Sequence, residues 1–170
     1  MEGRYYAVAS GNTLLIFLPQ QNEPPSANYA TFDLRNGHLV LDFDTTTGES
    51  AIFKGVMPRH YSGGGVTIYV HYSMTSATSG TCGWLTAFER VSDSQQDIDS
   101  DGFASANTLT AVTVPATSGH VDIASVAHTD GAQMDSVAVG EGFRLKITRD
   151  VANDDAAGDA ELWAIEIKET

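Results

Sequence analysis

The chain has 170 residues, 42% of them hydrophobic, which is enough for one domain with a core of its own. Nine basic side chains against 22 acidic ones give a net charge of −13, which disfavours nucleic acid and anionic membranes as partners. Cys82 is the single cysteine, so an intramolecular disulfide and a cysteine-based zinc site are excluded. No catalytic motif, cofactor fingerprint or membrane-spanning apolar run is present.

Residues 1–27 differ in character from the rest of the chain. Two short apolar pieces, 5–9 and 13–18, are separated by a turn signal and followed by a proline-rich stretch, 19–26. An apolar strand on such a linker is either an edge strand of its own domain or an arm laid on a neighbouring subunit. We expect an N-terminal arm and linker over residues 1–27, and a sandwich domain over 28–170. The expected partner-binding residues of the arm are Leu14, Leu15, Ile16, Phe17 and Leu18.

From residue 28 the chain consists of short β-branched and aromatic segments separated by turn clusters. This spacing predicts an all-β, antiparallel β-sandwich, of jelly-roll type, with little helix. Asn36-Gly37 is the clearest hairpin signal, because both residues tolerate the positive φ of a type I′ turn. The expected strands cover residues 29–34, 38–43, 50–53, 66–72, 82–91, 108–114, 121–127, 142–148 and 160–168.

Alternation along the strands predicts which side chains face the core. Segments 66–72 and 82–91 are expected to be adjacent strands at the centre of the sandwich. The last two strands are expected to pair across the loop 150–159, with Lys146 opposite Glu166. Expected core residues from them are Phe143, Leu145, Ile147, Trp163, Ile165 and Ile167.

Acidic residues supply the candidates for chemistry. Asp97, Asp99 and Asp101 match half of a calcium loop, but the twelfth position is Thr108 and not glutamate, so no metal site is expected. Asp42 and Glu89 are the only carboxyls in a distinctive apolar setting, and would be the candidates in a glycosidase. The five histidines lack the close spacing of a metal site. We therefore expect no catalytic residue and no cofactor.

Several stretches resemble small virion proteins of tailed bacteriophages, of the jelly-roll decoration or cement type. The likeness is carried by residues 30–44, by 53–65 with Ser62-Gly63-Gly64-Gly65, by 76–80, and by 143–150. It implies a non-enzymatic structural protein that bridges capsid subunits and stabilises the capsid. It also implies a homotrimer on the outer capsid surface of the virion, synthesised in the host cytoplasm, with the major capsid protein as partner.

Three alternatives remain open at this point. The first is a tail or head-fibre protein of similar sandwich fold. The second is a carbohydrate-binding module, for which Trp84 or Trp163 should be exposed beside the loop 97–101. The third is a glycoside-cleaving enzyme that uses Asp42 and Glu89.

Overall fold

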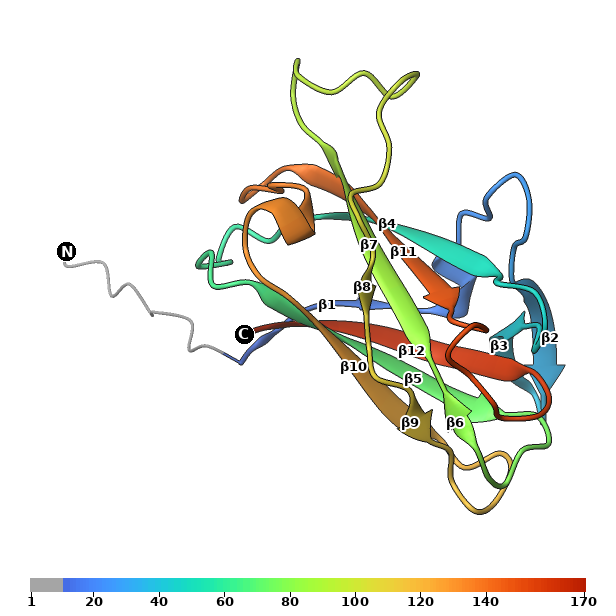
Figure 1. Cartoon of the computed structure of the whole chain (residues 1–170). Coiled ribbons are helices and arrows are strands. Elements are labelled where there is room, and N and C mark those ends of the chain that lie inside the picture. The colour runs from blue at the N-terminus through green and yellow to red at the C-terminus, as the bar shows by residue number, and fades with distance from the viewer. Residues whose placement is uncertain (1–10) are drawn as a thin grey trace.

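The computed structural model describes residues 11–170 as two antiparallel sheets that face each other across one core (Figure 1). Sheet A has the strand order β10-β5-β12-β3-β2, and β1 also pairs with β12; sheet B has the order β4-β11-β7-β8. A small third sheet joins β6 to β9. The strands are β1 (Thr13–Phe17), β2 (Thr31–Arg35), β3 (His38–Phe43), β4 (Ser50–Val56), β5 (Val66–Met74), β6 (Thr81–Cys82), β7 (Trp84–Val91), β8 (Asn107–Thr108), β9 (Val112–Thr113), β10 (Asp122–His128), β11 (Gly142–Arg149) and β12 (Ala160–Glu169).

Helix is confined to two short 3₁₀ turns in this part of the chain, η1 (Pro19–Gln21) and η2 (Ala132–Met134). No helix among residues 11–170 is long and apolar enough to cross a membrane. The prediction of a β-sandwich with little helix is confirmed.

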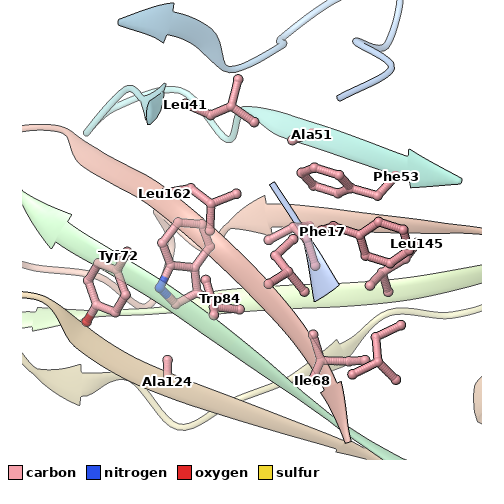
Figure 2. Close-up of a cluster of buried hydrophobic side chains, with 14 of the residues drawn as sticks. Phe17, Leu41, Ala51, Phe53, Ile68, Tyr72, Trp84, Ala124, Leu145 and Leu162 are labelled. Atoms are coloured by element: carbon pink, nitrogen blue, oxygen red, sulfur yellow. The ribbon is translucent and has the colours of Figure 1, made fainter. Parts of the chain in front are cut away.

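Alternation along β5 follows the prediction. Its four inward residues are completely buried, and they meet the inward side chains of β7 and β11 from the opposite sheet. Trp84 lies at the centre, with its ring 5.1 Å from that of Phe43 and 5.3 Å from that of Tyr72, both in edge-on geometry. Figure 2 shows this cluster, with side chains from both sheets filling the same space. The four buried residues of β5 are Val66, Ile68, Val70 and Tyr72.

Two predicted strand pairings are wrong. The segments 66–72 and 82–91 are not adjacent strands, because β5 belongs to sheet A and β7 to sheet B. Likewise β11 pairs with β4 and β7, whereas β12 pairs with β5, so Lys146 and Glu166 lie in different sheets. In both cases the connecting loop crosses from one sheet to the other, which is how a sandwich covers its two apolar inner faces.

Buried Arg149 holds the last connection between the sheets, from β11 to β12, in place. Its guanidinium forms an ion pair with Asp154, with Nε 2.8 Å from Oδ2. It also donates to the carbonyl oxygens of Phe43, Ala156 and Gly158 at 2.9–3.2 Å. Because each buried donor has an acceptor, the loop 150–159 is fixed against both sheets at the point where the chain changes layer.

The expected boundary at residue 27 requires a correction. Strand β1 pairs with β12 of its own domain, with Phe17 opposite Ile165. Leu14 and Phe17 are buried in the core, where the Phe17 ring lies 5.6 Å from that of Phe53. The apolar piece 13–17 is therefore an edge strand of the sandwich and not an arm on another subunit. The apolar piece 5–9 lies outside the described residues.

Phe17→Ala tests this placement. Phe17 is 3% exposed, so truncation should lower the free energy of unfolding by about 3–5 kcal/mol, measured by urea denaturation. Ile16→Ala, on the same strand but 59% exposed, should change it by no more than about 0.5 kcal/mol. Equal effects from the two variants would contradict a core position for β1.

Candidate functional site

An irregularity in β12 creates the main surface feature of sheet A. The register with β5 shifts between Leu162 and Ala164, so Trp163 is an extra residue without a partner in the ladder. Such a bulge bends the strand and redirects a side chain. The Trp163 ring points outward, is 46% exposed, and lies 6.4 Å from the His71 ring. The expected inward position of Trp163 is thus wrong, while Ile165 and Ile167 are buried as predicted.

Trp163 lines a hollow of about 440 Å³. The apolar part of the wall consists of Trp163, Val40 and Val121, and the remainder is polar or backbone. We call this hollow the Trp163 cleft, and its lining residues are Arg35, Asn36, His38, Val40, Ser73, Gly119, Val121 and Trp163.

Arg35 builds one wall of the Trp163 cleft. It lies where the β2–β3 hairpin turns through Asn36 and Gly37, with φ values of 48° and 80°, as the predicted type I′ turn requires. Its guanidinium reaches across to Glu161 of β12 and donates to the carbonyl oxygen of Met74 at 2.8 Å. The hairpin tip is thereby attached to the two central strands of sheet A.

Gly119 closes the cleft on the other side of Arg35. Its backbone N–H donates to the carbonyl oxygen of Met74 at 3.1 Å, so two segments share one acceptor. A Cβ at position 119 would come within 2.9 Å of Arg35 Nη2, and the φ of 82° is one that side chains other than glycine rarely adopt. Glycine is required here for the loop and the arginine to meet.

A pair of carboxyls lies next to this wall. Asp42 of β3 is directly opposite Glu161 of β12. Glu161 is 3% exposed, paired with Arg35, and accepts a hydrogen bond from Ser73 Oγ at 3.2 Å. Among the described residues, the buried Oδ1 of Asp42 has no hydrogen-bond partner. Burial, and then the negative charges of Asp159 and Glu161, raise the pKa of the Asp42 carboxyl to about 6.

The raised pKa of Asp42 makes the stability of the fold depend on pH. The folded chain holds the Asp42 proton more tightly than the unfolded chain, so the stabilisation is complete below about pH 4 and is lost as pH rises through about 6. Asp42→Asn cannot ionise and should exceed the natural protein in free energy of unfolding by about 1 kcal/mol near pH 8, allowing for solvent screening. Urea melts should show the difference vanishing near pH 4.

Asp44→Asn is the matched control for this variant. Hydrogen bonds from Thr46, and also from Thr47, lower the pKa of the exposed Asp44 carboxyl to about 2. Its stabilising contribution is therefore present at neutral pH and is lost on acidification. Asp44→Asn should be less stable than the natural protein near pH 8, the opposite direction to Asp42→Asn. A shift in the same direction for both would show that burial at Asp42 is not the cause.

The outer face of sheet B carries a second hollow, of about 390 Å³. Glu89 lies there, buried, with its Oε2 2.7 Å from Arg144 Nη1. Arg144 also pairs with Glu23, whose other oxygen is 2.8 Å from Lys54 Nζ. The charged groups of this hollow thus neutralise one another.

Asp42 and Glu89 belong to the outer faces of opposite sheets. Asp42 pairs in register with Glu161 in sheet A, and Glu89 with Arg144 in sheet B. A glycosidase needs its two carboxyls on either side of one bond, about 5–10 Å apart. These two cannot act together on one substrate.

The loop 97–101 is also on the sheet B side. Ile98 lines the second hollow, and the loop projects beyond the end of β7 (Figure 1). Asp97 accepts a hydrogen bond from the backbone N–H of Asp99, as in an ordinary turn. Within residues 11–170, no three acidic, histidine or cysteine side chains are grouped so that they could hold a metal ion. The calcium candidates Asp97, Asp99 and Asp101 do not converge.

Of the two tryptophans considered, Trp84 is buried and Trp163 is exposed, but not beside the loop 97–101.

Of the five expected arm residues, Leu14 and Phe17 are core residues, whereas Ile16 and Leu18 are exposed. Sequence reasoning did not identify Arg35, Asn36 or His38 as site residues. The turn Asn36-Gly37 was the only local signal, and it indicated a hairpin without indicating what the hairpin covers.

Comparisons with known proteins concern the fold. No protein-family model matches the chain, and no curated protein matches it in sequence. The CBM22-1 xylan-binding domain of Paenibacillus barcinonensis Xyn10C superposes with a TM-score of 0.52 at 13% identity, over 96% of this chain and 97% of that domain. A family 11 carbohydrate-binding module from Clostridium thermocellum, solved with a β-1,3-1,4-mixed-linked tetrasaccharide, gives 0.46 at 9% identity, over 94% of this chain and 96% of the module. The first likeness confirms the antiparallel β-sandwich of jelly-roll type.

Proposed function

We propose that this protein binds a polysaccharide chain in the Trp163 cleft without cleaving it. The observation that carries the proposal is the exposed indole of Trp163, held on a strand bulge inside a hollow of sugar-sized dimensions. A pyranose ring has an apolar face of C–H groups that stacks on an indole, and hydroxyls around its edge that need polar partners. Asn36, His38 and Ser73 provide such partners around Trp163.

Binding without catalysis is favoured by the position of the carboxyls. Neither Asp42 nor Glu161 is among the residues that line the Trp163 cleft, and Glu161 is covered by Arg35 and Ser73. A general acid or a nucleophile must reach the glycosidic oxygen or the anomeric carbon directly. The xylan-binding domain with a similar fold supports a polysaccharide as the class of ligand, since such a sandwich can serve binding alone.

Trp163→Ala tests the proposal. Affinity electrophoresis in gels containing xylan, mixed-linkage β-glucan or mannan should show retardation of the natural protein by at least one of them. Because an aromatic anchor at the centre of an interface contributes about 2 kcal/mol or more, Trp163→Ala should weaken that binding about 30-fold.

Ile98→Ala is the control, since it removes an exposed apolar side chain from a loop on the sheet B side, away from the Trp163 cleft. It should leave the retardation unchanged. Retardation that survives Trp163→Ala, or is lost equally in Ile98→Ala, would contradict the Trp163 cleft as the binding site.

We propose as a second candidate the capsid role that the virion resemblance implies. It is favoured by the exposed apolar side chains of β2, an edge strand of sheet A. Phe32 and Leu34 are 53% and 66% exposed, and Tyr29 lies just before the strand. An edge strand with exposed apolar residues is a surface on which another subunit can dock.

Light scattering tests this second candidate. The virion role predicts the mass of a homotrimer, and the double variant Phe32→Ser with Leu34→Ser should reduce it to that of a monomer, because the docking surface loses its apolar area. Ile98→Ser, exposed on a different surface, should leave the trimer intact. A natural protein that is monomeric at all concentrations would count against a self-assembled decoration protein.

A further inference from the structure

We propose that the Trp163 cleft selects neutral polysaccharides and rejects polyuronates, because its one lining cation is already neutralised by a buried carboxylate. This inference rests on the proposed binding of a polysaccharide at the same cleft. It adds the chemical class of the ligand and names Arg35 and Glu161 as the residues that determine it.

Arg35 is the only lysine or arginine among the residues that line the cleft. Its Nη1 is in contact with Glu161 Oε2 and donates to the carbonyl oxygen of Met74, while Nη2 lies 3.4 Å from that of Thr75. A guanidinium binds an anionic ligand best through two parallel N–H groups. Here Nη1 is held by two protein acceptors and Nη2 by one, and the charge is paired with Glu161, so Arg35 serves as a wall of the cleft more than as an anion receptor.

The surroundings of Arg35 carry excess negative charge. Glu161 is buried opposite Asp42, and the Asp42 carboxyl in turn experiences the negative charges of Asp33, Asp159 and Glu161. The one guanidinium therefore pairs with Glu161, while the neighbouring Asp42 carboxyl has no cation of its own among the described residues. A uronate placed in the cleft would lose part of its hydration, and its carboxylate would be repelled by the protein carboxyls nearby. Both effects disfavour binding.

Neutral hydroxyls meet suitable partners in the same place. Asn36 offers an amide donor and acceptor, and His38 offers an imidazole, both on the β2–β3 hairpin side of the cleft. Ser73 donates its hydroxyl proton to Glu161, which leaves its oxygen free to accept a hydrogen bond. A neutral sugar can therefore pair its hydroxyls without bringing in a charge that would need compensation.

Calorimetric titration of the full chain tests the selectivity. The probes are xylohexaose, a mixed-linkage β-glucan tetrasaccharide and mannohexaose as neutral ligands, and hexagalacturonate as the acidic one, at low and high salt. We expect at least one neutral oligosaccharide to bind, and hexagalacturonate to bind about tenfold or more weakly, with part of the difference lost at high salt.

Glu161→Gln tests the cause. The substitution keeps the shape of the side chain but leaves the charge of Arg35 uncompensated, so hexagalacturonate affinity should rise several-fold while the neutral ligand is affected little. Glu141→Gln is the matched control, because Glu141 forms a comparable ion pair with Arg90 away from the cleft. It removes the same charge and should leave both affinities unchanged.

Asp42→Asn is a second variant in case Glu161→Gln does not fold. It removes a negative charge beside Glu161 and breaks no hydrogen bond of the buried Oδ1, so it too should raise hexagalacturonate affinity. A natural protein that binds hexagalacturonate as tightly as the neutral ligands would overturn the selectivity and leave polysaccharide binding in place. Failure of every oligosaccharide to bind would overturn both the selectivity and the proposed function.

Discussion

The arrangement of sheet A depends on β12, which has two different neighbours along one edge. Residues 160–162 pair with β3, and residues 165–168 pair with β1. The bulge lies between these two stretches, so the ladder to β5 adjusts at the same place where the neighbour on the other edge changes. Trp163 is exposed because it falls at this junction, where β3 has ended its pairing and β1 has yet to begin. The candidate site is thus a result of how one strand satisfies its hydrogen bonds on both edges.

The same junction accounts for the electrostatics of the cleft. Glu161 is two residues before Trp163 and within the regular part of the ladder, where its neighbours Asp42 and Ser73 are directly opposite. Its charge is compensated by Arg35, which is brought over by a tight two-residue turn. A buried carboxylate without such a partner would cost several kcal/mol, so the hairpin position and the carboxylate depend on each other. The wall that Arg35 forms in the Trp163 cleft and the proposed specificity of the cleft therefore have the same origin.

Local features of this fold were predictable and long-range ones were not. The alternation in 66–72, the turn at Asn36-Gly37 and the burial of Ile165 and Ile167 follow from periodicity and turn chemistry, which involve neighbours in sequence. The assignment of β5 and β7 to opposite sheets depends on loops fixed by distant groups such as Arg149, which no local pattern shows. The outward orientation of the Trp163 side chain could not be predicted without knowing of the bulge, since strict alternation places Trp163 with Ile165 in the core. The cleft combines four separate segments, so neither its shape nor its charge could be read from any one of them.

The pairing of β1 with β12 has a consequence for synthesis on the ribosome. Thr13 is opposite Lys168, so an early strand of sheet A completes its ladder only when one made about 150 residues later becomes available. Until then β1 exposes the side chains of Leu14 and Phe17, which pack against residues that are still being translated. Folding of sheet A can therefore be completed only after β12 has been synthesised, and until then the acidic composition of the chain opposes its aggregation.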